Sequence, residues 1–119
     1  MASKKTTYGK ADTQADFVAT LLGAKKTTRS GATLIGGKGD VADDISLFEC
    51  KTSMVEKDSF TVKREWLDKI QKERFEDRKR FAFLVQNFGG RGDIDNYVVM
   101  RIEDFEELYN AYKEAIDEE

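Results

Sequence analysis

The sequence contains no histidine, no proline and a single cysteine, Cys50. The absence of histidine removes imidazole from catalysis and from metal binding. One cysteine excludes both an internal disulfide framework and a zinc site built from several cysteines. Any chemistry performed by this chain must therefore use carboxylates, lysines and hydroxyl groups, together with a hard cation if one is bound.

Long hydrophobic runs are also missing. No apolar segment approaches the ~20 residues needed to span a bilayer, and the N-terminal "MASKKTTYGK" has no apolar core of the kind found in signal peptides. We therefore expect a cytosolic protein without a membrane partner. A chain of 119 residues with 39% hydrophobic and 36% charged residues is expected to fold as one domain over residues 1–119, with residues 1–10 frayed.

The charge is distributed unevenly along the chain. Residues 1–80 carry 17 Lys and Arg against 13 Asp and Glu, whereas residues 81–119 carry 3 against 10. A polyanion is expected to bind the first part, where the basic side chains of "GAKKTTR" and "KREWLDKIQKERFEDRKR" can reach phosphates. The second of these two stretches is equally well explained as the solvated face of a helix. The candidate phosphate contacts are Lys25, Lys26, Arg29, Lys63 and Arg64.

Hydrophobic periodicity divides the chain into alternating helices and strands. The expected helices are residues 11–22, 66–77 and 105–116, and the expected strands are residues 27–37, 45–52, 59–62, 80–88 and 96–102. This order favours an α/β fold in which helices cover both sides of a mixed sheet.

The strand at 45–52 ends in a group of polar residues. Alternation places Glu49 and Lys51 on one face and Cys50, expected to be buried and inert, on the other. With Asp40 brought close by pairing, two carboxylates and a backbone carbonyl would form the hard oxygen site that Mg²⁺ or Mn²⁺ prefers. Lys51 would orient or deprotonate the attacking water and stabilise charge on the phosphate. The alternative for Glu49 and Lys51 is an exposed ion pair on an edge strand.

Two further aspartates, Asp43 and Asp44, lie between Asp40 and this strand. Aspartate often hydrogen-bonds to the backbone of the turn in which it stands. We therefore expect Asp43 and Asp44 to be turn residues rather than metal ligands.

Gly39-Asp40-Val41 followed by Glu49-Cys50-Lys51 resembles the signature of the PD-(D/E)xK nuclease superfamily, with glycine in place of the usual proline. Within that superfamily the chain is most similar to archaeal and phage-type Holliday junction resolvases. The segments "LLGAKKTTRSGA", "SFTVKREWLDKI" and "YVVMRIEDFEELY" also resemble segments of those proteins. The resemblance covers roughly residues 10–112.

This resemblance implies a restriction-endonuclease-like α/β/α core with a central mixed sheet, a homodimer, and Mg²⁺-dependent hydrolysis that leaves 5′-phosphate ends, with Mn²⁺ as a substitute. Carried over position by position, Asp40 and Glu49 would bind the metal and Lys51 would be the catalytic lysine. Ser30 would supply a hydroxyl near the scissile phosphate.

The family's metal site usually includes a glutamate on the first helix, but residues 1–48 contain no glutamate. The resemblance places the missing residue near position 15, where Asp16 or Gln14 could stand in, and we take Asp16 as the candidate third ligand. An alternative role for Asp16 is structural, since Thr13-x-x-Asp16 resembles a helix-capping box.

These observations lead to the hypothesis of a structure-selective DNA endonuclease that resolves branched double-stranded DNA, such as four-way junctions, as a homodimer. The flanking segments favour a phage origin, which would place the protein in the cytoplasm of the host cell. Two alternatives remain open. One is a nucleic-acid-binding or regulatory protein that keeps the fold without catalysis, and the other is a general nuclease of the same superfamily acting in restriction, repair or phage DNA processing.

Overall fold

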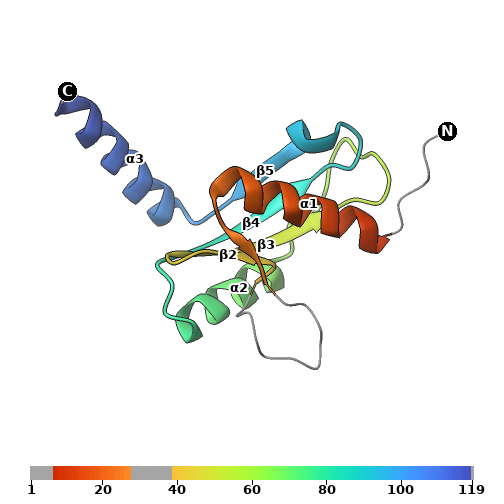
Figure 1. The fold of residues 1–119 in the computed structure, drawn as a ribbon, viewed down its shortest axis with the longest axis horizontal. Coiled ribbons are helices and arrows are strands. Elements are labelled where there is room, and N and C mark those ends of the chain that lie inside the picture. Colours follow the sequence, from red (N-terminus) through yellow and green to blue (C-terminus); the bar gives the residue numbers. More distant parts are fainter. Residues whose placement is uncertain (1–6, 28–38, 119) are drawn as a thin grey trace.

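The computed structural model describes residues 7–27 and 39–118 (Figure 1). Five strands form one sheet in the order β1-β2-β3-β4-β5, in which β3 and β4 are parallel and every other pair is antiparallel. The elements are α1 (Thr7–Leu22), β1 (Lys25–Lys26), β2 (Val41–Ala42), β3 (Ser46–Thr52), α2 (Arg64–Glu76), β4 (Phe81–Asn87), the 3₁₀ helix η1 (Gly92–Asp95), β5 (Asn96–Val99) and α3 (Ile102–Asp117). The predicted α/β class with a mixed sheet is confirmed.

The centre of the sheet is covered on both faces. All seven residues of β4 are buried, in keeping with its nearly continuous apolar sequence. On one face Phe48 and Phe83 pack with Val18 of α1, and on the other Leu47 packs with Ile70 of α2. Because neighbouring residues of a strand point to opposite faces, β3 contributes to both half-cores and α1 and α2 lie on opposite sides of the sheet.

Two predicted elements require correction. The strand expected at 59–62 is wrong, because no strand is assigned between Ser53 and Lys63. Parallel strands cannot be joined by a tight hairpin, so the chain after β3 must cross over through α2 before it can return as β4. At the N-terminus, α1 begins at Thr7, before the predicted start at residue 11.

The strand expected at 27–37 lies almost entirely outside the described residues. Ser30 and Arg29 belong to that segment, so their predicted roles stay predictions.

The C-terminal helix has the predicted periodicity, but its apolar face is not packed against the rest of the chain as the apolar face of an amphipathic helix normally is. Its large apolar side chains are exposed, with Tyr112 at 66% and Ile116 at 49% of their full exposure. Figure 1 shows α3 projecting from the sheet rather than lying across it. None of the helices in the described ranges is long and apolar enough to cross a membrane.

Candidate active site

Glu49 and Lys51 lie on the face of β3 that α2 covers. The Lys51 Nζ is 3.7 Å from Glu49 Oε1, and Glu49 is only 6% exposed. At Glu49 and Lys51 the strand β3 is paired with β4 alone, because β2 reaches only Leu47 and Phe48. The burial of Glu49 nevertheless contradicts the alternative of an exposed ion pair. A carboxylate and an ammonium group therefore meet at a partly closed position on the sheet.

Asp40 is brought to the same place by the antiparallel pairing of β2 with β3. Its backbone N–H donates to the Phe48 carbonyl at 2.8 Å, and its Oδ2 accepts from the Cys50 N–H at 2.8 Å. Asp40 is buried, and its carboxylate is bound to the residue that follows Glu49. The nine-residue separation in sequence thus becomes a direct electrostatic interaction between Asp40 and Glu49.

The electrostatics of this pair are unfavourable to the ionised form of Glu49. Burial, which removes water from the carboxylate, is the largest cause that raises the pKa of Glu49, and the negative charge of Asp40 is the second. Lys69 and Lys51 oppose this rise, and the charge of Glu73 adds to it. Burial and the neighbouring negative charges thus outweigh the two lysines in their effect on the pKa of Glu49.

Helix α2 contributes three side chains that the sequence did not single out for the site. Lys69 Nζ lies 3.6 Å from Glu49 Oε1 and 3.7 Å from Glu73 Oε2, so one ammonium group lies between two carboxylates. The ring of Trp66 lies beneath Lys51, whose Nζ is 4.8 Å from the ring centroid. These three residues share one flank of the helix at a spacing of i, i+3, i+7, the sequence signal by which they could have been found.

The backbone conformation of Gly39 explains why glycine stands where the PD-(D/E)xK signature usually has proline. Its φ is +73°, whereas proline is fixed near about −65°. Its N–H donates to Glu73 Oε1 at 3.0 Å, and proline has no N–H to donate. A Cβ at this position would also lie 3.2 Å from the Phe48 carbonyl oxygen. The turn that precedes Asp40 thus requires glycine, and the Gly39 N–H connects this turn to α2.

Gln14 occupies the part of α1 where the resemblance places a glutamate. Its buried Nε2, which carries two hydrogens, lies within hydrogen-bond distance of three acceptors: the Lys51 carbonyl at 2.9 Å, the Val85 carbonyl at 3.2 Å and Asn96 Oδ1 at 3.1 Å. Three oxygen acceptors surround this nitrogen, so the carboxylate oxygen that a glutamate would place there would face only acceptors. The amide of Gln14 therefore serves as a hydrogen-bond donor to the sheet.

Asp16 is directed elsewhere. Its Oδ1 lies 2.9 Å from the Lys26 Nζ, and both side chains are well exposed. Within the described residues, no group of three or more acidic or cysteine side chains is placed to hold a metal ion. The structure thus brings Asp40 and Glu49 together and leaves Asp16 paired with Lys26.

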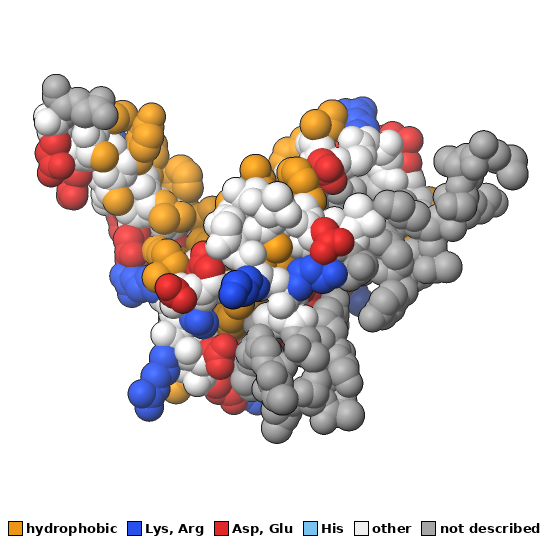
Figure 2. All heavy atoms as spheres, in the orientation of Figure 1, with side chains coloured by type: hydrophobic (Ala, Val, Ile, Leu, Met, Phe, Trp, Pro, Cys, Tyr) orange, Lys and Arg blue, Asp and Glu red, His pale blue; other side chains and the backbone are white. Residues whose placement is uncertain are grey.

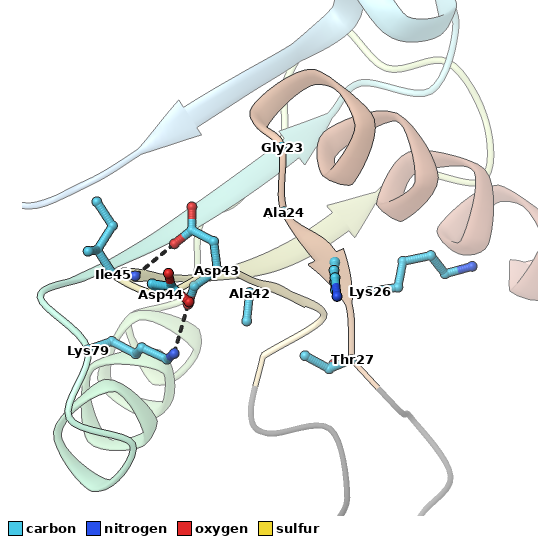
Figure 3. A pocket seen from close by; sticks show the side chains of 10 residues that line it. Gly23, Ala24, Lys26, Thr27, Ala42, Asp43, Asp44, Ile45 and Lys79 are labelled. Atoms are coloured by element: carbon cyan, nitrogen blue, oxygen red, sulfur yellow. Dashed lines mark hydrogen bonds between the residues drawn. The ribbon is translucent and has the colours of Figure 1, made fainter.

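The remaining predicted residues lie around the sheet. Lys25 and Lys26 are exposed and line a hollow of about 600 Å³ beside β1 and β2. Figure 3 shows Asp43, Asp44 and Lys79 on one side of this hollow and Lys26 and Thr27 across it. The hollow therefore combines both signs of charge, and it is bounded by Ile45, at the opposite end of β3 from Lys51.

Asp43 is confirmed as a turn residue, because its Oδ1 accepts the N–H groups of Ile45 and Ser46 at 3.0 and 2.8 Å. Lys63 lies near the candidate site, with its Nζ 5.6 Å from the Trp66 centroid. Arg64 lines a groove on the other flank of α2.

Comparison of the chain with protein-family models, with curated proteins and with solved structures gives no match. The functional argument therefore depends on the geometry described above and on the signature residues.

We predict that replacing Gly39 by proline, the residue of the resembled signature, destabilises the protein. The substitution is incompatible with the positive φ and removes the hydrogen bond to Glu73, so the loss of unfolding free energy should be about 3 kcal/mol or more. Gly23→Ala is the control, because Gly23 also has a positive φ but a Cβ there meets no atom within 4 Å. Urea unfolding should show a much smaller loss for the control, and equal losses would contradict the role of Gly39.

We predict that Glu49→Gln stabilises the protein at neutral and alkaline pH in the presence of a chelator. The raised pKa of Glu49 means that ionisation costs stability in the folded state. This cost is absent below the ordinary pKa of 4.5, grows as the pH rises, and is complete above the raised pKa. Thermal unfolding should therefore show a melting-temperature advantage for the variant at pH 8 that disappears near pH 4.

The exposed α2 carboxylate Glu65 provides the matched control, and Glu65→Gln should keep the pH profile of the unmodified chain. A Glu49→Gln protein that is less stable at pH 8 would contradict the unfavourable ionisation of Glu49.

Proposed function

We propose that the protein is a Mg²⁺-dependent, structure-selective DNA endonuclease on a restriction-endonuclease-like α/β/α core. The observation that carries the proposal is the meeting of Asp40, Glu49 and Lys51. Two buried carboxylates interact, and a lysine ammonium group lies 3.7 Å from one of them on the same strand face. The PD-(D/E)xK signature needs this combination for phosphodiester hydrolysis.

The residues present fit a hard divalent cation. The donors are oxygens, and the pKa of Glu49 is raised by burial and by Asp40, so a cation would relieve a repulsion that the fold otherwise maintains. Two carboxylates suffice, because Mg²⁺ is often held by one or two carboxylates together with water and substrate phosphate. When bound, the cation would polarise the phosphate and lower the pKa of the attacking water.

The chain's own residues would position the lysine and neutralise charge. Trp66 lies beneath Lys51 and Glu49 lies beside it, so the ammonium group is held at the site without being enclosed. In that position Lys51 can orient the attacking water and stabilise charge developing on the phosphate. Lys69, also 3.6 Å from Glu49, provides a second positive charge for the phosphate.

The proposed substrate is branched double-stranded DNA, with the four-way junction as the preferred form, and the proposed active unit is a homodimer whose two sites cut opposing strands. Phosphate contacts from Lys25, Lys26 and Lys63, with Arg29 and Arg64 as further candidates, would position DNA without reading its sequence. Shape selectivity is consistent with such contacts. The proposed location is the cytoplasm of a host cell, for a phage-encoded enzyme.

We predict that the protein cleaves synthetic four-way junctions in the presence of Mg²⁺ and that Lys51→Ala lowers the cleavage rate at least about 100-fold, because the transition-state charge loses a stabilising ammonium group. Lys57→Ala, which removes an exposed lysine of the loop after β3, is the control and should retain full activity.

Three outcomes would change the assignment. Equal cleavage of linear and branched duplex would exclude a resolvase and leave a general nuclease of the superfamily. Activity retained by Lys51→Ala would contradict the mechanism. Junction binding without any cleavage would favour the non-catalytic DNA-binding alternative.

We predict that Asp16 is not required for metal binding. In calorimetric titrations with Mn²⁺, Asp16→Asn should bind like the unmodified chain, because Asp16 pairs with Lys26, whereas Asp40→Asn and Glu49→Gln should bind at least about tenfold more weakly. A loss with Asp16→Asn as large as that with Glu49→Gln would contradict a two-carboxylate site.

A further inference from the structure

Helix α3 presents a stripe of large apolar side chains that the rest of the described chain leaves uncovered. The stripe consists of exposed residues at helical spacing. Its members are Ile102, Phe105, Leu108, Tyr109, Tyr112 and Ile116. Figure 2 shows hydrophobic side chains along the side of α3 that faces the notch between this helix and the body, with acidic side chains on its outer side. An isolated helix of this length is marginal in water, so the stripe requires a partner surface.

The body of the same chain does not provide that surface. Within the described ranges α3 shares no extensive contact with another helix or strand. At its base, the Arg101 guanidinium donates to both Asp104 oxygens at 3.0 and 3.1 Å. One and a half turns along, Glu107 pairs with Arg80, which immediately precedes β4. Of these two contacts, only the Arg80–Glu107 pair joins the helix to another part of the chain.

A groove of matching character lies on the flank of α2 away from the candidate active site. It has a volume of about 500 Å³ and a largely apolar floor and walls. Its apolar lining includes Val62, Leu67, Ile70, Val99 and Met100. Arg64 and Arg101 also line the groove, against a single acidic residue, Asp68. It would therefore accept an apolar surface flanked by carboxylates.

We propose that the groove of one copy of this chain holds the α3 stripe of a second copy, so that two chains form a two-fold dimer by reciprocal exchange of α3. Charge favours this arrangement over direct pairing of two α3 helices, because α3 carries six carboxylates and one lysine and would repel its own copy. The same acidity disfavours a lipid surface, for which amphipathic helices usually carry Lys and Arg.

The position of Arg101 makes the exchange geometrically reciprocal. This residue caps the start of α3 and also lines the groove, so each groove lies at the base of the helix that its own chain would donate. When one helix enters the partner's groove, two-fold symmetry brings the second helix to the first groove. The β5 strand runs antiparallel to β4, so α3 begins at the end of the sheet opposite to Lys51 and leaves both candidate sites open.

The test is the oligomeric state of the full chain in solution without DNA or metal, so it is independent of the proposed nuclease activity. Sedimentation across a wide range of concentrations should give a species of twice the 13.6 kDa chain mass. Leu108→Lys should raise the dimer dissociation constant at least about 100-fold, because each dimer would bury two unpaired charges. Asn110→Lys adds the same charge to the polar face of α3 and should leave the dimer intact.

A monomer at every concentration would overturn the proposal, as would a dimer that Leu108→Lys does not weaken. The groove is tested by cysteine pairing, since the native Cys50 is buried. A chain carrying both Leu67→Cys and Leu108→Cys should form an intermolecular disulfide on oxidation. Efficient cross-linking by Leu108→Cys alone would overturn the groove assignment and place two α3 helices against each other.

Discussion

The parallel pairing of β3 with β4 is the constraint on which the candidate site depends. Two parallel strands in succession force the chain to cross over the sheet, and the crossover carries α2 onto the face where Glu49 and Lys51 point. The flank of α2 that faces them then provides an aromatic ring and a second lysine. The acidic and basic groups of the site therefore come from segments separated in sequence, and the sheet topology assembles them.

The buried carboxylates show how such a site conflicts with stability. Glu49 is shielded from water and close to Asp40, and both conditions favour its protonated form. A structural role would be served equally well by a neutral side chain. An acid in these surroundings is useful where its negative charge binds a cation. The free-energy cost of keeping Glu49 ionised is then relieved when the cation enters the site, and this relief adds to the binding affinity.

The sequence predicted those parts of the structure that depend on local periodicity. Alternation placed Glu49 and Lys51 on one face of β3, and 3.6-residue spacing located all three helices. It could not predict that residues 59–62 form no strand, since their apolar pattern is compatible with either state and only the sheet topology decides. Nor could it identify Lys69, because the flank of α2 that meets β3 is set by tertiary packing. The helical stripe of α3 was visible, whereas its exposure was not.

Gln14 gives the sheet a property that its strands do not have alone. One side-chain amide binds the Lys51 carbonyl on β3, the Val85 carbonyl on β4 and the side chain of Asn96, the first residue of β5. Three neighbouring strands are thus fastened to α1 through a single nitrogen atom. The contact with the Lys51 carbonyl therefore couples the position of helix α1 to the strand that carries the candidate catalytic lysine.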